Sequence, residues 1–521
     1  MAKVITAEQA VALIKDGDII GSATAGMAGQ PEEIIIELEK RFLETGSPKN
    51  ITLMHAAGNG NFKDKGANHL AHPGLIKRWI GGHIGASPDL AKMVSENKCE
   101  GYNWPQGSIT QLYREIAAKR PGLITTVGLG TFVDPRVEGS KMNAAATEDL
   151  VKLVEIDGEE YMFYKSFPIQ VALIRGTTAD EEGNLTTDKE GVALEILPLA
   201  QAVKNSGGIV IAQCEHLAKA HSLHPKKVKV PGVLIDYVVV AKQENQWQTT
   251  TEYFEPAFSG DTKINLGTLP EMRLDERLII ARRAAMELKL GAIVNLGIGI
   301  PADGISNVAG EEGISNMMTL TTECGGIGGV PAGGGNFGQV YNPDMIVDQQ
   351  AQFDWYDGGG VDVAFLGLAQ ADKQGNINVS KFGGRAVGCG GFIDITQTSK
   401  KVVYCGSFTS KGLKVAVTDG KLVIANEGAG KKFINQVEQI TFSGQYAAKV
   451  KQPVLYITER AVFRLVNGEV TLIEIAPGID LEKDVLGQME FVPKIAADLK
   501  EMPAELFQPK WGKLKDIITA E

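Results

Sequence analysis

The sequence predicts an α/β protein made of two related open α/β domains with mainly parallel sheets. Three observations lead to this prediction: a long internal repeat, an alternation of short apolar runs with helical segments, and a composition typical of globular proteins. The chain has 521 residues, of which 44% are hydrophobic and 22% are charged. A chain of this length and composition holds enough apolar material for sizeable cores.

The internal repeat is clearest in two segments that align without a gap. Residues 171–184 read VALIRGTTADEEGN, and residues 363–376 read VAFLGLAQADKQGN. Each is an apolar run of strand length followed by a turn of the form Ala-Asp-x-x-Gly-Asn. A second pair follows in the same order, with GGIVIAQCE running through Cys214 and KVVYCGS through Cys405. A repeat of this length indicates a duplicated domain rather than a solenoid of short units.

A weaker third pair lies near the start of each half. LIKDGDIIGSATAGMAGQP ends at Pro31, and LKLGAIVNLGIGIP ends at Pro301. The wider spacing of this pair predicts that the first half carries roughly 80 more residues between its first and later elements. A polar segment without sustained periodicity separates the halves and predicts a connection. We therefore expect a first domain over residues 1–255, a linker over 256–274 and a second domain over 275–521.

Continuous apolar runs such as GVLIDYVVVA and DVAFLGLA alternate with amphipathic helical segments in both halves. One such segment, RLDERLIIARRAAMEL, opens the second half with apolar residues at helical spacing. Strands that are apolar throughout and alternate with helices indicate a largely parallel sheet covered on both faces.

The charge and the cysteines exclude several functional classes. The net charge is −11 and no basic stripe is visible, so we expect no nucleic-acid partner. No window approaches the roughly 18 uninterrupted apolar residues of a membrane span, and the N-terminal segment lacks the pattern of a secretory signal. The five cysteines are scattered without CxxC spacing, which argues against a disulfide framework or a zinc site. These features predict reduced thiols, no metal site, no membrane partner and a cytoplasmic location.

The densest unusual segment is LTTECGGIGGVPAGGGNFGQ, residues 320–339. A strand-like run ends there in Glu323, and several glycines follow closely. A carboxylate at a strand end, beside backbone without side chains, is open to a bulky electrophile, and neighbouring N–H groups are able to stabilise an oxyanion. The residues alone are equally compatible with a surface loop that carries an incidental glutamate.

A second glycine-rich element, NLGIGIP over residues 295–301, follows an apolar run and precedes a predicted helix. Bare backbone N–H groups at a helix start suit a phosphate. Ala302 replaces the third glycine of the dinucleotide fingerprint, however, and an ordinary strand-to-helix turn explains the element better from these residues alone. All seven histidines lie in the first half and no GxSxG elbow is present, so a structural role is expected for each histidine.

These motifs together resemble family I CoA-transferases. TTECGGIGG resembles the family's catalytic glutamate motif, NLGIGIPADGI its Gly-x-Gly-x-Pro loop against CoA, and IEIAPGIDLEKDVL its C-terminal end. In the first half, NWPQGSITQLYREIAAKRPGLITTVGLGTFVDPRVEGSKMN is similar to the segment through the family's Gly-x-Gly-Thr element. The matches run from Gly17 to Val485, and they resemble most the single-chain propionate and acetate CoA-transferases, in which α-like and β-like halves are fused.

The resemblance implies a ping-pong reaction with Glu323 as the nucleophile. The carboxylate attacks an acyl-CoA thioester, the CoA thiolate returns to the resulting anhydride, and an acceptor carboxylate resolves the glutamyl-CoA thioester. The implied substrates are acyl-CoA and short-chain carboxylates, with coenzyme A as substrate and covalent intermediate and no permanently bound cofactor. Relatives of this kind are homo-oligomers, often tetramers, so the resemblance also implies a homo-oligomer, with a tetramer favoured.

Further site residues follow from the resemblance. It places Asn378, Gly390 and Gly391 beside the catalytic glutamate, although turn formation explains Asn378 equally well, and it brings Gln106 to the substrate from the first domain. Cys324 stands where relatives often have another small residue and is expected to be a small filler, because no histidine or lysine is near it in sequence. The implied CoA contacts are Gly297, Ile298, Gly299, Ile300 and Pro301.

Four other functions compete with this prediction. An acyl-CoA hydrolase would resolve the same glutamyl intermediate with water, and a 3-oxoacid CoA-transferase would apply the same chemistry to another acid. The incomplete fingerprint counts against a nicotinamide-dependent oxidoreductase, and Glu323 in its glycine context counts against a non-catalytic binding protein. Propionate, acetate, lactate, butyrate and acetoacetate all stay open as substrates at this stage.

Overall fold

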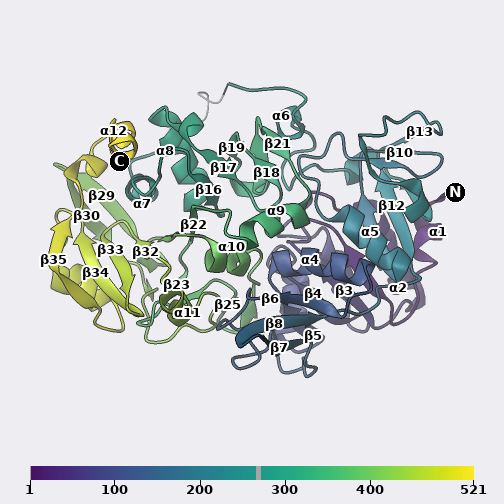
Figure 1. Cartoon of the computed structure of the whole chain (residues 1–521), viewed down its shortest axis with the longest axis horizontal. Helices are drawn as coiled ribbons and strands as arrows, with labels where there is room; N and C mark the ends of the chain where they lie inside the picture. Colours follow the sequence, from purple (N-terminus) through teal and green to yellow (C-terminus); the bar gives the residue numbers. More distant parts are fainter. Residues whose placement is uncertain (1, 266–271, 521) are drawn as a thin grey trace.

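The fold is seen in a computed structural model that describes residues 2–265 and 272–520. Figure 1 shows two α/β halves side by side, the first from purple to teal and the second from teal through green to yellow. Both halves contain large, mainly parallel sheets, which confirms the predicted fold class. Within the described ranges, no helix has the length and apolar character needed to cross a membrane.

The sheet of the first half has eight strands, and every neighbouring pair is parallel. Its central strands are buried along most of their length, as expected for a parallel sheet covered on both faces. In spatial order the strands are β1 (Lys3–Val4), β15 (Tyr237–Val240), β12 (Ile209–Cys214), β9 (Val171–Arg175), β2 (Ile19–Ser22), β3 (Ile51–His55), β4 (Ile76–Gly81) and β5 (Glu100–Asn103).

The sheet of the second half has ten strands, with a parallel centre of five, antiparallel pairs on both sides of this centre and a parallel pair at one edge. In spatial order they are β21 (Met345–Ile346), β18 (Gly326–Ile327), β17 (Thr319–Thr321), β16 (Ile293–Leu296), β22 (Val363–Gly367), β27 (Val402–Cys405), β32 (Val454–Ile457), β33 (Ala461–Val466), β34 (Glu469–Ile475) and β35 (Lys494–Glu501).

The α-helices are short, and those that follow strands pack on the sheets. They are α1 (Ala7–Val11), α2 (Glu32–Thr45), α3 (Pro88–Ser95), α4 (Gln106–Ala117), α5 (Ile196–Asn205), α6 (Pro256–Ser259), α7 (Glu276–Ala285), α8 (Ser306–Glu311), α9 (Gln349–Asp357), α10 (Phe392–Thr398), α11 (Gly444–Lys449) and α12 (Leu514–Thr519).

The remaining strands form small peripheral sheets beside the two main ones. They are β6 (Gly122–Thr125), β7 (Val151–Ile156), β8 (Glu159–Lys165), β10 (Thr178–Asp180), β11 (Leu185–Thr186), β13 (His216–Ala218), β14 (Val228–Val230), β19 (Val330–Pro331), β20 (Val340–Tyr341), β23 (Gln370–Ala371), β24 (Ile377–Asn378), β25 (Lys381–Phe382), β26 (Arg385–Ala386), β28 (Thr409–Ser410), β29 (Lys414–Thr418), β30 (Lys421–Asn426) and β31 (Gly430–Lys431).

The internal repeat corresponds to a repeated structure. Five parallel strands run β3-β2-β9-β12-β15 in the first half and β17-β16-β22-β27-β32 in the second. The three repeated sequence pairs fall on strands at the same places in these two orders. The Ala-Asp-x-x-Gly-Asn turns are also built alike. Asp180 accepts hydrogen bonds from the N–H two residues on (3.0 Å), from the N–H of Asn184 (2.9 Å) and from its side-chain amide (3.0 Å). Asp372 accepts the same three from the N–H two residues on and from Asn376, at 3.0, 3.1 and 3.0 Å.

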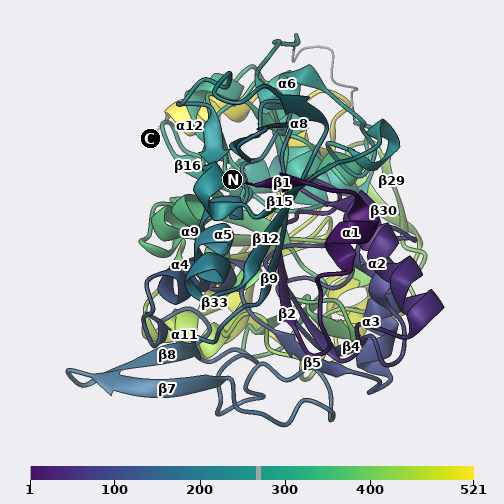
Figure 2. The ribbon, with the colours of Figure 1, turned by 90° about the vertical axis from the view of Figure 1, so that its right-hand side faces the viewer.

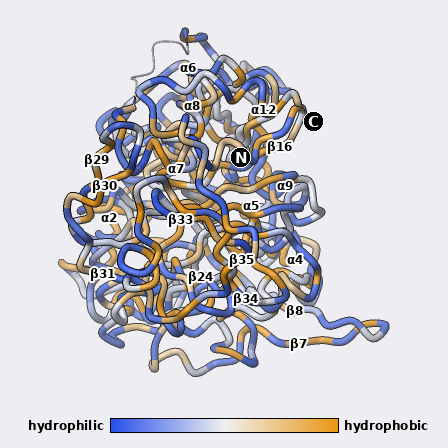
Figure 3. Tube along the Cα trace, turned by 90° about the vertical axis from the view of Figure 1, so that its left-hand side faces the viewer, coloured by the Kyte–Doolittle hydropathy of each residue, from blue (hydrophilic) through white to orange (hydrophobic). Residues whose placement is uncertain are grey.

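The additional residues of the first half lie between β3 and β9. They include β4, β5, α3, α4 and an antiparallel sheet of order β6-β8-β7. Figures 2 and 3 show hairpin β7–β8 extending away from the body, with both hydrophobic and hydrophilic residues along it. This insertion explains why the third sequence pair is spaced more widely than the other two.

The expected linker, residues 256–274, lies partly outside the described residues, because 266–271 are among those that the structure does not describe. Its first residues form α6, where Phe258 is buried and its ring packs on Tyr341 of the second half at 4.6 Å between centroids. Residues 256–259 therefore pack on the second half.

Buried apolar side chains form two clusters, one for each half. The first draws on residues from Ala2 to Val239, and the second on residues from Leu278 to Ile518. Some residues of the second half nevertheless belong to the first cluster. They are Cys324, Ala386, Cys389 and Ile393.

Helix α4 of the first half is held directly by the second half. The buried carboxyl of Asp394, on α10, accepts hydrogen bonds from the N–H groups of Gly107 and Ser108, both at 3.2 Å. Farther along α4, Arg114 makes a bidentate ion pair with Asp354 on α9, at 2.6 and 2.5 Å. An acidic group at a helix N-terminus satisfies backbone N–H groups that have no partner within the helix. The first turn of α4 is thus fixed by a side chain of the opposite half.

We expect Gly107→Ala to destabilise the protein. A Cβ at this position would lie 2.5 Å from Asp394 Oδ1 and 2.6 Å from Phe353 Cδ1, so the free energy of unfolding should fall by about 1–3 kcal/mol. The matched control is Gly310→Ala in α8, where an added Cβ meets nothing nearer than Ser315 Oγ at 4.0 Å. That change should raise the free energy of unfolding by up to about 1 kcal/mol. Denaturant unfolding of both variants is the measurement, and equal effects would contradict the expectation.

Candidate active site

Glu323 lies at the tip of the tight turn that joins β17 to antiparallel β18. The turn is closed by the N–H of Thr322, which donates to Gly326 O at 2.9 Å, while the Thr322 hydroxyl donates to Gly338 O at 3.1 Å. From α9, the side-chain amide of Gln352 donates to Thr322 O at 3.2 Å. The backbone on both sides of Glu323 is therefore fixed by hydrogen bonds.

Glycine is required immediately after this turn. Gly325 has φ +107°, and a Cβ there would lie 2.1 Å from Val347 O. The backbones of these two residues are also paired, because the Val347 N–H donates to Gly325 O at 2.9 Å. The run of glycines thus allows neighbouring backbone to close on the turn that carries Glu323.

The Glu323 carboxyl is only 7% exposed. Burial raises its pKa above the usual range, and hydrogen bonds from its own backbone and from Cys324 oppose the shift. The thiol of Cys324 lies 3.7 Å from Glu323 Oε1. Burial raises the pKa of Cys324 well above its ordinary value, and the neighbouring Glu323 and Glu195 raise it further. The cysteine is therefore a neutral thiol near neutral pH and a poor nucleophile.

Glu323 lines a cavity of about 290 Å³ between the halves, a volume close to the lower end of the range for small-molecule sites. Its walls are largely glycine and apolar side chains. From the first half they include Ala25, Gly26, Ala57, Gly58, Phe62, His83, Ala86, Gln106 and Thr250. From the second half they include Gly297, Ile298, Cys324, Phe337, Leu366, Gly367, Val379, Val387, Gly388, Cys389, Gly390, Gly391, Phe392 and Ile395.

The loop over residues 387–391 of the second half is hydrogen-bonded onto the strand ends of the first. Val387 O accepts from the N–H groups of Ile84 (2.9 Å) and Gly85 (3.0 Å), and Gly390 N–H donates to Gly82 O at 2.7 Å. The N–H of Gly390 is therefore already used. By contrast, the N–H of Gly391, which lines the cavity, has no hydrogen-bond partner in the described part of the chain. Gly391 is the glycine of this pair that has a donor to offer to a ligand.

Gln106, the first residue of α4, reaches the cavity from the first half as expected. Its backbone N–H donates to Gly390 O at 2.9 Å, which places it against the loop just described. The side chain is buried, and its Nε2 has no partner among the described residues. A buried amide without a partner costs free energy unless a ligand or water accepts from it.

The glycine-rich element over residues 295–301 follows β16 and leads into a short π-helical turn, Ile300–Ile305. Gly297 and Ile298 line the cavity, whereas Gly299, Ile300 and Pro301 are not among its lining residues. Gly299 has φ +85°, a conformation that suits glycine, and its carbonyl accepts from Asp303 N–H at 2.8 Å. The structure brings the first two of these five residues into the cavity with Glu323.

Comparisons with known proteins agree with this geometry. The family model described as coenzyme A transferase matches residues 4–241. The chain is 54% identical to caffeate CoA-transferase of Acetobacterium woodii, over 99% of this chain and 100% of that protein. It is 44% identical to acetate CoA-transferase YdiF of Escherichia coli K12, over 97% of this chain and 95% of that protein. The chain belongs to the coenzyme A transferase family.

Solved structures give the same result. The crystal structure of the acyl-CoA transferase YdiF apoenzyme from Escherichia coli O157:H7 superposes with a TM-score of 0.92 at 43% identity, covering 98% of this chain and 97% of that one. A thioester complex of the same protein with CoA superposes with a TM-score of 0.91, over the same shares of the two chains. This CoA-transferase therefore shares its whole two-half architecture with those structures.

Asn378 is not among the lining residues of this CoA-transferase's cavity. Its side chain is buried and hydrogen-bonded both within its own turn and to the neighbouring strand β23. The amide donates to Gln370 Oε1 and Lys381 O, both at 2.6 Å, and its oxygen accepts from the N–H groups of Ser380 (3.0 Å) and Lys381 (3.2 Å). Turn formation, the alternative inferred from the sequence, explains the bonds to residues 380 and 381, whereas the bond to Gln370 crosses to the neighbouring strand β23.

Two cavity residues were not predicted from the sequence. His83 was expected to have a structural role, yet it lines the cavity. Among the described residues, its ring has no hydrogen-bond partner. Burial lowers the pKa of His83 to about 4, so the ring is neutral near neutral pH. Phe62 packs edge-on against His83, with 6.4 Å between the ring centroids. Neither residue lies in a recognisable motif, so a signal for them was absent from the sequence.

Glu195 is a second buried carboxyl near the turn that carries Glu323, at the residue before α5. It is fully buried, both carboxyl oxygens lack a partner in the described ranges, and it is close enough to Cys324 to raise that thiol's pKa. Burial raises the pKa of Glu195 to about 8, so it is mostly neutral at pH 7. Within residues 2–265 and 272–520, no group of three or more His, Cys, Asp or Glu side chains is arranged to hold a metal ion.

The CoA-transferase should tolerate Cys324→Ala. Because the thiol is neutral and packs in the core, we expect kcat/KM to fall by less than about tenfold, or about 1.4 kcal/mol. Steady-state transfer of CoA from propionyl-CoA to acetate is the measurement, with Glu323→Ala as the inactive comparison. A loss in Cys324→Ala as large as that in Glu323→Ala would assign the nucleophile to the thiol instead.

Glu195→Gln should change how stability depends on pH. Since the folded-state pKa is about 8 and an unfolded glutamate titrates near 4.3, folded protein binds the extra proton between those values. The wild type therefore loses stability as pH rises through this window, whereas the glutamine variant has no such proton. We expect the Tm of Glu195→Gln, relative to that of the wild type, to rise from pH 5 to pH 8. A difference in Tm that stays constant over this pH range would refute the assignment.

Proposed function

We propose that this chain moves CoA between short-chain acyl-CoA and a free carboxylate by a ping-pong reaction in which Glu323 is the nucleophile. The observation that carries the proposal is a buried carboxyl at the tip of a glycine turn, facing a cavity that both halves line. The raised pKa of Glu323 makes the carboxylate more basic than an ordinary glutamate, and basicity supports attack on a thioester. Burial also keeps water away from the activated intermediates.

In the first step Glu323 Oε attacks the thioester carbonyl, and the CoA thiolate leaves, giving an acyl-glutamyl anhydride. The thiolate then attacks the glutamyl carbonyl, the donor carboxylate leaves, and a glutamyl-CoA thioester remains. An acceptor carboxylate reverses these steps and departs as the new acyl-CoA. The proposed oxyanion donor is the N–H of Gly391, with the unpartnered amide of Gln106 on the carboxylate of the donor or acceptor.

The CoA arm is proposed to lie along the wall of the second half. Gly297 and Ile298 line that wall, and Ile298 is an exposed apolar side chain at the cavity. We propose that Gly299, Ile300 and Pro301 continue this contact outside the cavity. Support comes from the relative in Escherichia coli O157:H7, which has been crystallised as a thioester complex with CoA.

The acid is proposed to be of the acetate or propionate type. A relative named acetate CoA-transferase and a relative named caffeate CoA-transferase both align over nearly the whole chain, which supports a monocarboxylic acid. The proposal further includes coenzyme A without a permanently bound cofactor, a homo-oligomer with a tetramer favoured, two domains joined near residues 256–274, and a cytoplasmic location.

The test is intact-mass spectrometry after incubation with propionyl-CoA or acetyl-CoA and no acceptor, with a borohydride-treated sample alongside. We expect a CoA adduct that maps to Glu323 and is lost in Glu323→Ala. The isosteric Glu323→Gln variant is the matched control for folding, because it keeps the shape of the turn and removes the nucleophile. Steady release of CoA without an acceptor and without any adduct would instead support a hydrolase.

A further inference from the structure

The ring of Phe62 is 53% exposed, yet it lines the cavity that holds Glu323. Isolated apolar side chains on a protein surface need no explanation, but an exposed ring at the rim of a substrate cavity is placed to contact a ligand. Its edge-on contact with the neutral His83 ring forms one aromatic end of the cavity.

The backbone of Phe62 is strained. Its φ is +64°, in the left-handed region that bulky residues rarely adopt. Its N–H donates to Ala86 O at 2.9 Å, which fixes the residue against the first-half wall. Because glycine or asparagine would relieve this strain, packing alone does not account for an aromatic residue here.

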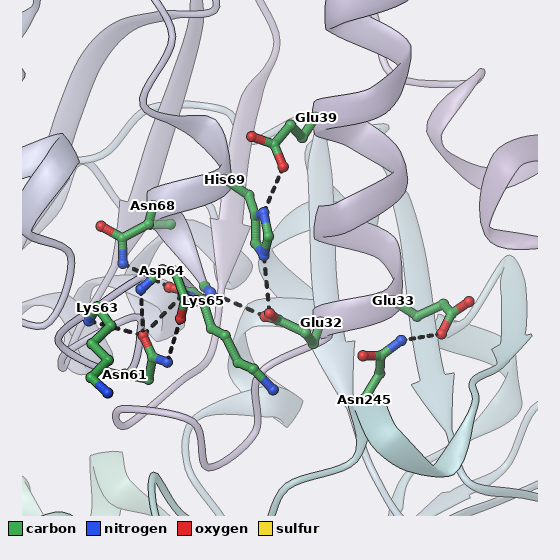
Figure 4. Close-up of polar contacts among 12 residues, drawn as sticks. Glu32, Glu33, Glu39, Asn61, Lys63, Asp64, Lys65, Asn68, His69 and Asn245 are labelled. Carbon is green, nitrogen blue, oxygen red and sulfur yellow. Dashed lines mark hydrogen bonds and ion pairs between the residues drawn. The ribbon is translucent and has the colours of Figure 1, made fainter.

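The turn around Phe62 is held by side chains, several of which are drawn in Figure 4. The carboxamide oxygen of Asn61 accepts from the N–H groups of Lys63 (3.0 Å), Asp64 (2.9 Å) and Lys65 (2.9 Å). The Asn61 amide also donates to Asp64 Oδ1 at 2.9 Å. These contacts determine the conformation of the loop and offset the strain at Phe62.

A second set of contacts ties the far end of the loop to α2. The N–H of Gly66 donates to Glu32 Oε2 at 3.1 Å, and Glu32 is almost fully buried. The His69 ring bridges two carboxylates, with Nε2 3.1 Å from Glu32 and Nδ1 2.6 Å from Glu39 (Figure 4). The loop is thus a fixed part of the first half that holds the Phe62 ring in place.

Small residues of the first half line the same cavity as Phe62 and Glu323. Ala57, Gly58 and Ala86 line the cavity there, and a Cβ on Gly58 would lie 3.2 Å from Ala86 Cβ and 3.4 Å from His83 Nδ1. This wall belongs to the first half, whereas the glycine loop proposed for CoA belongs to the second, so the free space along the first-half wall is the part left for the acyl group. None of the residues that line the cavity is a lysine or arginine.

We propose that Phe62 closes the acyl end of the cavity and sets an upper limit on acyl length, so that the enzyme selects short, apolar, monocarboxylic acyl groups. This inference rests on the proposed function. With His83 neutral and no cation in the wall, a second carboxylate on the acyl chain would be buried without a counter-charge. A longer apolar chain would meet the Phe62 ring, which the braced loop prevents from moving aside.

The test compares kcat/KM for propionyl-, butyryl-, hexanoyl- and succinyl-CoA, with acetate as acceptor. We expect Phe62→Ala to raise the hexanoyl-to-propionyl ratio by about tenfold or more, since one or more methylenes then gain space. Phe62→Asn should do the same, because asparagine tolerates the left-handed backbone and lacks the ring. Succinyl-CoA should stay a poor substrate in every variant. Leu43 lies on α2 and is 62% exposed, so Leu43→Ala is the control and should leave the ratio unchanged.

Two results would overturn the proposal: an equal change in kcat/KM for all acyl-CoAs, which would assign Phe62 to CoA itself, or succinyl-CoA turnover that matches propionyl-CoA. The covalent adduct on Glu323 is measured first, in the wild type with propionyl-CoA. If no adduct forms, the proposed function fails. If the adduct forms and the chain-length profile is the same with and without the Phe62 ring, only the present inference fails.

Discussion

The buried contact between Asp394 and the first turn of α4 is the constraint on which the site depends. It joins a side chain of one half to backbone donors of the other, and it lies beside Gln106 and the loop over residues 387–391. Burial raises the pKa of Asp394 well above its ordinary value, with Asp357 adding to the effect, while the N–H groups of Gly107 and Ser108 oppose it. A carboxyl in this position is costly to bury unless the helix end is there, so the two halves specify each other's position.

Catalytic geometry follows from that docking. The loop over residues 387–391 binds the first half through several of its backbone groups, whereas the N–H of Gly391, a residue that lines the cavity, has no partner among the described residues. Glu323 is held by its own tight turn and needs no contact across the junction. The proposed nucleophile and the proposed donor therefore come from one half, while the other half completes the shape of the cavity around them. Such fixed positioning is what covalent catalysis requires of the protein.

Much of the fold and the centre of the site could be predicted because their signals are local. The Ala-Asp-x-x-Gly-Asn turns are encoded in six consecutive residues, and the structure builds both with the same hydrogen bonds. Glu323 was visible because glycines mark the turn around it. Asn378 was ambiguous, because a side-chain amide is found both in turns and in active sites. Phe62, His83 and Glu195 had no local signal, because their roles depend on burial, on a positive φ and on strands that are distant in sequence.

The repeat also explains where the cavity lies. Strands β2 and β3 of the first half are equivalent to β16 and β17 of the second. Residues that follow the carboxyl ends of these four strands line the same cavity. After β2 come Ala25 and Gly26, and after β16 come Gly297 and Ile298. The residues after β3 include Ala57, whereas those after β17 include Glu323. Open α/β sheets bind ligands at these carboxyl edges. The duplicated halves thus bring two equivalent edges to one cavity, and only one of them carries the proposed nucleophile, which leaves the small residues of the other to shape the proposed acyl pocket.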